Sequence, residues 1–208
     1  MAKIINFPKK DENVPITYTN FKGKNYYLHE GKTKTGKSKY TFSLKNEGFL
    51  VKTIPDGFEI YENPNGQVFC RKIPPKIITD EEVEIVKSGM KKHSSIKRFK
   101  VDVKKNEIIV YIANHGGIDN AESILSDFSE FPLSDFRKNA FIVETSHYTP
   151  EMKFTLVDKE QRDFIVQRYN YRGRIDDWMQ ILDGHGPLDK LVKNYVVHLG
   201  KDSFFELY

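Results

Sequence analysis

The stretch from Ala140 to Tyr171 constrains the fold of this chain more than any other. It holds three runs rich in β-branched and aromatic residues, AFIVETS, KFTLVD and DFIVQRYNY, separated by the turn-rich segments HYTPE and KEQR. This spacing is typical of an antiparallel meander, in which consecutive strands pair through short turns. We therefore expect the second part of the chain to be built on an antiparallel sheet that includes a strand over residues 140–146.

The flanking segments predict further strands and several helices. Residues 98–103 alternate between polar and apolar, whereas residues 107–113 are apolar on both faces, which predicts a half-exposed strand paired with a central strand. Helices are expected where apolar residues recur at helical spacing or cap residues stand, over 79–93, about 120–128 and 187–199. These patterns predict an α+β domain over residues 77–208, with an antiparallel sheet covered by about three helices.

The first part of the chain has a different pattern. Residues 22–73 contain short β-type runs joined by glycine-containing turns at 34–37, 55–57 and 63–66, which predicts a small, lysine-rich antiparallel β-domain. Residues 1–21 have few periodic apolar residues, so we expect an extended or disordered arm. The prolines at 74 and 75 mark the boundary between the two domains.

Charge is unevenly distributed along the sequence. Residues 1–105 carry 22 Lys or Arg against 12 Asp or Glu, whereas residues 106–208 carry 11 against 17. The basic excess of the first part is nearly all lysine, a hydrated point charge suited to general attraction of phosphates. The alternative is that these lysines only keep a β-domain in solution and protect its edges from pairing.

The densest group of lysines stands in the segment GKTKTGKSK, residues 31–39. Lys32, Lys34, Lys37 and Lys39 are therefore the predicted nucleic-acid-binding residues. The first eight letters match the phosphate-loop pattern G-x-x-x-x-G-K-S, but a strand-type run follows where that motif requires a helix. We interpret the segment as the tip of a basic β-hairpin. Tyr40 and Phe42 can either stack on bases or form the core of this domain.

The catalytic candidates are four residues in the second part of the chain: His115, Glu144, His147 and His185. His115 follows the predicted central strand, Glu144 and His147 can supply an acid/base pair or two metal ligands, and His185 stands between glycines before a helix. Each also has an ordinary structural interpretation as a turn or loop residue. Glu151-Met152-Lys153 and Asp102-Val103-Lys104 match the acid-x-Lys half of a nuclease signature, which arises readily by chance in so charged a chain.

Arg172 and Arg174 alternate with Tyr171 and Gly173 after the last long run of the meander. Guanidinium groups interleaved with aromatic rings suit phosphate or base recognition, so both arginines are predicted secondary contacts to nucleic acid. The alternative is local pairing with Asp176 and Asp177.

The sequence favours a nucleic-acid-associated binding protein that uses the basic hairpin domain. The alternatives are a metal-dependent or histidine-based hydrolase or nuclease in the C-terminal domain, and a protein-interaction adaptor, so the sequence does not decide whether the chain is an enzyme. No cofactor and no membrane partner is expected. The N-terminal residues lack the apolar core of a signal peptide and Cys70 is the only cysteine, which together predict a cytoplasmic protein.

Overall fold

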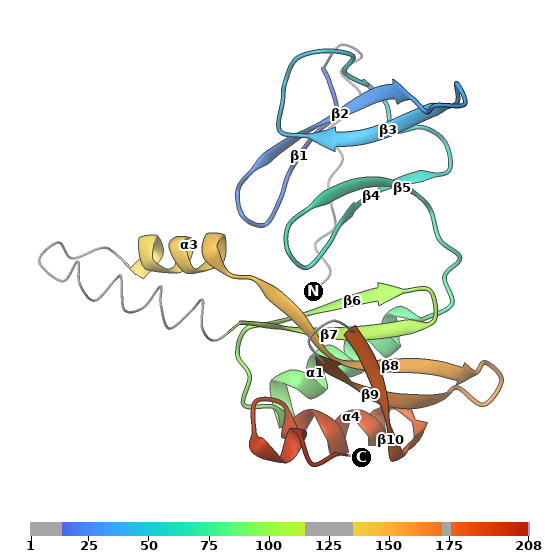
Figure 1. Ribbon diagram of the computed structural model, residues 1–208, viewed down its shortest axis with the longest axis vertical. Coiled ribbons are helices and arrows are strands. Elements are labelled where there is room, and N and C mark those ends of the chain that lie inside the picture. The colour runs from blue at the N-terminus through green and yellow to red at the C-terminus, as the bar shows by residue number, and fades with distance from the viewer. Residues whose placement is uncertain (1–13, 115–134, 172–175, 208) are drawn as a thin grey trace, which may run out of the picture. The chain divides into compact units, whose positions relative to one another are not determined.

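The chain folds into two compact units, residues 1–73 and residues 74–208. The computed structural model describes residues 14–114, 135–171 and 176–207 (Figure 1). Its strands form antiparallel sheets of three, two and five strands, and the described α-helices all belong to the second unit. The expected α+β class is confirmed.

The N-terminal unit holds the two smaller sheets. The first has the order β1-β2-β3 and the second pairs β4 with β5. The strands are β1 (Thr17–Thr19), β2 (Asn25–Lys32), β3 (Ser38–Ser43), β4 (Phe58–Glu62) and β5 (Val68–Lys72).

Strand β1 lies inside the segment that we expected to be an extended arm. It pairs with the start of β2, with Tyr18 opposite Tyr26. A run of three residues is too short to show a period in the sequence, and its place in the sheet comes from pairing with β2. Residues 17–19 are thus part of the β-domain.

The C-terminal unit is built on a five-stranded antiparallel sheet, in which two of the three runs of the predicted meander are strands, residues 153–158 and residues 163–171. Its five strands have the order β10-β9-β8-β7-β6, with every neighbouring pair antiparallel. The strands are β6 (Phe99–Lys104), β7 (Glu107–Ala113), β8 (Tyr148–Asp158), β9 (Asp163–Tyr171) and β10 (Asp176–Pro187). The helices are α1 (Asp80–His93), α3 (Asp135–Thr145) and α4 (Leu188–Tyr195), with 3-10 turns at Val196–His198 and Asp202–Phe204.

Helix α3 corrects one expectation. We expected a strand over 140–146, but residues 140–145 complete a helix, and the Ser146 amide after its end donates to the Ile142 carbonyl oxygen at 2.9 Å. The run AFIV is apolar at successive positions, so its periodicity does not distinguish a strand from a helix, and its β-branched residues favoured the wrong choice. The helix expected about residues 120–128 lies outside the described residues.

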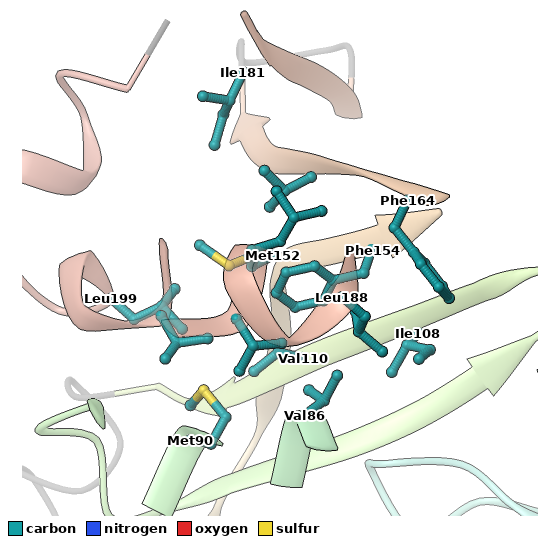
Figure 2. Packing of buried hydrophobic residues seen from close by; sticks show 14 of the residues in the cluster. Val86, Met90, Ile108, Val110, Met152, Phe154, Phe164, Ile181, Leu188 and Leu199 are labelled. Carbon is teal, nitrogen blue, oxygen red and sulfur yellow. The ribbon is translucent and has the colours of Figure 1, made fainter. Parts of the chain in front are cut away.

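The hydrophobic core of the C-terminal unit lies between one face of the sheet and helices α1 and α4. Alternate residues of β7 and β8 point to this face, as the period of a strand requires. Figure 2 shows them packed against side chains of the two helices. The core residues with no measurable exposure include Ile108, Val110, Met152, Phe154, Val86, Met90 and Leu199. The predicted central strand β7 is paired on both edges, by β6 and β8.

Helix α1 begins with the predicted capping box. The Thr79 amide donates to the Glu82 carboxylate at 2.8 Å, and the Glu82 amide donates to the Thr79 hydroxyl at 3.3 Å. Glu82 is buried and also accepts from the Arg162 guanidinium in the turn between β8 and β9, with Nε to Oε1 at 2.9 Å. One carboxylate therefore joins the start of the helix to a turn of the sheet.

Gly89 allows helices α1 and α4 to pack closely. A Cβ atom at this position would stand 2.1 Å from Cγ1 of Val192 on α4. Glycine lowers helix propensity, yet α1 continues past this residue to His93. The packing of the two helices thus explains a glycine that the local pattern disfavours.

We expect Gly89→Ala to lower the free energy of unfolding by about 1–3 kcal/mol, because the added methyl group overlaps Val192. Val192→Ala alone should also destabilise, because it leaves a cavity. In the double variant the methyl group added at position 89 occupies part of that cavity, so the two losses should be less than additive. Urea denaturation of the four proteins measures this coupling, and strictly additive losses would show that the two residues do not share the space.

Candidate nucleic-acid interface

The predicted basic hairpin is formed by β2, β3 and the loop between them. The Thr33 amide donates to the Lys37 carbonyl oxygen at 2.8 Å, and the Gly36 amide donates to the Thr33 carbonyl oxygen at 2.9 Å. Gly36 has φ +81°, a left-handed conformation that costs a residue with a side chain about 1–2 kcal/mol. A three-residue loop with a left-handed glycine at its end is a frequent hairpin connection.

The same loop occurs three times in the described part of the N-terminal unit, residues 14–73. In the β1–β2 loop, Asn20 and Gly23 repeat the bonds of Thr33 and Gly36, and in the β4–β5 loop Asn63 and Gly66 do so. At the start of each loop a side-chain oxygen accepts an amide of the returning strand, as the Thr33 hydroxyl does from Lys37 at 3.1 Å. The sequence signal is a polar residue three positions before a glycine, which our sequence analysis did not recognise as a repeated pattern.

The end of this hairpin projects beyond its sheet. One edge of β2 pairs with β3, and the other pairs first with β1 and then with residues 49–51. The last of these bonds on the second edge, within the described part of the chain, runs from the Glu30 amide to the Phe49 carbonyl oxygen at 3.0 Å. From Gly31 to Lys39 every residue is exposed. We call these nine residues the lysine hairpin.

The strand register places its lysines on both faces. Lys32 pairs with Ser38, and Gly31 pairs with Lys39. Because successive residues of a strand point to opposite faces and directly opposed residues to the same face, Lys32 and Lys39 point in opposite directions. Lys37 shares the face of Lys39, and Lys34 stands in the loop. The positive charge therefore surrounds the ribbon instead of covering one side.

The lysine hairpin carries four positive charges and no acidic residue. Within the described residues, its lysines are absent from the ion pairs that the structure forms. Residues 1–73 hold 13 basic and 7 acidic residues, so the hairpin supplies four of the six net charges of this unit. The charge is concentrated at its most exposed end.

Tyr40 and Phe42, which follow the hairpin on β3, are partly buried in the unit. The Tyr40 ring meets the Phe58 ring edge-on, with the centroids 5.6 Å apart, and Phe42 is half-buried opposite the fully buried Leu28. The Tyr40 hydroxyl also contacts the Glu30 carboxylate at 3.3 Å. Of the two roles considered for Tyr40 and Phe42, this geometry favours the core over a stacking surface.

The catalytic candidates do not form a metal-binding group among the residues that the structure describes. Glu144 is exposed near the end of α3, and His147 is exposed in the link to β8. His185 is exposed on β10, where it pairs with Ile165 of β9. His115 lies outside the described residues, as do Arg172 and Arg174.

Lys153 of the matched acid-x-Lys signature is part of the sheet. Its side chain lies on the face opposite the helices, is buried, and contacts the Glu107 carboxylate at 2.7 Å. The ammonium also lies 4.7 Å from the centre of the Trp178 ring. Burial raises the pKa of the neighbouring Glu151 carboxyl group. These contacts give Lys153 a structural role. The alternation of β8 already predicts that its side chain points to the other face of the sheet from Phe154.

Comparisons with protein-family models, with curated proteins and with solved structures found no match. Within the described residues, the helices are too short or too polar to cross a membrane.

Tyr18 joins the two small sheets of the unit that carries the lysine hairpin. Its hydroxyl donates to Oε2 of Glu62 on β4 at 2.8 Å, and the other oxygen of Glu62 accepts the Phe21 amide at 2.9 Å. Burial, followed by the hydrogen bond and the charge of Glu62, raises the pKa of Tyr18 from 10.0 to about 12.

The raised pKa predicts an alkaline loss of stability. The folded chain holds the Tyr18 proton more tightly than the unfolded chain, so this contribution is fully present below pH 10 and is lost as the pH rises through about 12. Tyr18→Phe should therefore show a smaller fall in stability between pH 10 and 12 than the unmodified protein. Urea denaturation at several pH values tests this, and parallel pH profiles for the two proteins would contradict it.

Proposed function

We propose that this protein is a cytoplasmic nucleic-acid-binding protein that contacts phosphates with Lys32, Lys34, Lys37 and Lys39. The observation that carries the proposal is the projecting lysine hairpin, with four exposed lysines on both faces and no acidic residue. Nucleic acid is a dense polyanion, and lysine contacts to it release condensed counterions. Arg172 and Arg174 are proposed secondary contacts on the basis of their sequence context.

Two observations make the other functions less suitable. A metal-dependent hydrolase needs metal-binding groups that converge, and the described ranges contain no group of three or more His, Cys, Asp or Glu residues that could hold a metal ion. The adaptor needs an acidic surface for a basic partner, but residues 74–208 carry 22 acidic against 20 basic residues, a net charge of only −2. The lysine hairpin, in contrast, holds four positive charges in nine residues with no acidic residue.

Replacing all four hairpin lysines by glutamine should weaken binding to oligonucleotides of any sequence. The slope of log K against log salt should also become shallower by about 3–4, because each phosphate contact of a lysine contributes about 0.9. Fluorescence anisotropy with a labelled oligonucleotide, titrated at several KCl concentrations, measures both quantities.

A control variant with the same change of charge replaces four exposed lysines of the C-terminal unit by glutamine: Lys159, Lys190, Lys193 and Lys201. It should keep most of the affinity and nearly the full salt slope. The proposal fails if the hairpin variant is folded by circular dichroism and binds as the unmodified protein does, or if the two variants lose affinity equally.

A further inference from the structure

We infer that the preferred nucleic acid is a DNA duplex in B form, and that the lysine hairpin enters its major groove. This inference rests on the proposed function, and it names the ligand class of the same residues. It comes from the size of the projecting ribbon, the two-sided placement of its lysines, and the side chains at its end.

The projecting ribbon has the dimensions of the major groove. It extends from Gly31 to the loop at Lys34, which at about 3.3 Å per residue is about 10 Å, and its two strands lie about 4.8 Å apart. The major groove is about 12 Å wide and 8.5 Å deep and admits a two-stranded ribbon, whereas the minor groove is only about 6 Å wide. With its side chains, the ribbon fits the former and is too wide for the latter.

The two-sided charge matches a groove with a phosphate chain on each wall. Lys32 points to one face of the ribbon, and Lys37 and Lys39 point to the other. On a flat surface or a single strand, one of these faces would be turned away from the phosphates. Between the two walls of a groove, both faces contribute, and the loop residue Lys34 lies nearest the floor.

The end of the hairpin has few side chains that can recognise a base sequence. Besides lysine it holds only glycine, threonine and serine; asparagine, glutamine and the planar fork of arginine are absent, and lysine is a flexible point charge with less geometric selectivity. Binding should therefore tolerate changes of sequence. It should not tolerate a change of helix form, because the major groove of A-form RNA is deep and too narrow for side chains to read.

A competing ligand is a single strand that stacks on Phe49, whose side chain is 85% exposed next to the base of the hairpin. Its backbone is held beside Glu30, so the ring is displayed from a fixed position. A single ring on one edge does not explain the lysines on both faces. The experiment below separates the two ligands, because Phe49→Ala should weaken binding only if bases stack there.

The test uses the full chain and one sequence prepared as a DNA duplex, an RNA duplex and a DNA single strand. The DNA duplex should bind at least about tenfold more tightly than the other two at 0.1 M salt, because the single strand has no second groove wall and the RNA duplex does not admit the ribbon. Lys32→Gln and Lys39→Gln should each reduce the salt slope by about 0.9 on the DNA duplex. Phe49→Ala should bind the duplex as the unmodified protein does.

Dimethyl sulfate footprinting locates the groove, because guanine N7 lies in the major groove and adenine N3 in the minor groove. The protein should protect guanine N7, and the variant lacking all four hairpin lysines should not. Equal or tighter binding of RNA duplex or single strand, protection of adenine N3 alone, or an effect from only one face of the hairpin overturns the inference. In those cases a loss of binding in the four-lysine variant still supports the proposed function. If that variant binds as the unmodified protein does, both the proposed function and this inference are wrong.

Discussion

The left-handed glycine that closes each hairpin loop is the constraint on which the N-terminal unit depends. Gly36 fixes a loop of three residues, and this loop length sets which residues of β2 and β3 stand opposite each other. A slip of one residue in the register would move every side chain of one strand to the other face. The placement of Lys32 and Lys39 on opposite faces therefore follows from a backbone conformation a few residues away, and not from any interaction of the lysines themselves.

Loop geometry matters so much here because the N-terminal unit has a very small core. Among its described residues only Leu28 and Val68 are buried hydrophobic residues, whereas the C-terminal unit buries much of one face of a five-stranded sheet beneath two helices. Small domains bury too little apolar surface to be stabilised by packing alone. Turn hydrogen bonds and the Tyr18–Glu62 contact thus carry a larger share of the stability, while the exposed lysines carry almost none. Changes of the lysines should affect binding without unfolding the unit.

The features that were predicted from the sequence are those set by neighbouring residues. The capping box of α1 and the pairing of β8 with β9 across a short turn depend on spacings of a few positions, and the structure contains both. Helix α3 was missed because its apolar run fits either period, and the reason for Gly89 was missed because Val192 is far away in the sequence. The site shows the same division: the lysines of the hairpin could be found from composition, but their two-sided placement needed the register. The contact of Lys153 with Glu107 also joins different strands, which no local pattern shows.

The net charge of each part of the chain depends on where the chain is divided. Dividing the sequence at residue 105 gives a first part with a net charge of +10, but the fold divides at residue 73 and leaves +6 on the N-terminal unit and −2 on the other. Net charge is a poor guide at physiological salt, where screening acts over about 8 Å. Over that distance a phosphate meets only the nearest side chains, and the lysine hairpin presents four cations with no carboxylate of its own. Local density, more than the contrast between the two units, is therefore what would attract a polyanion to this end of the ribbon.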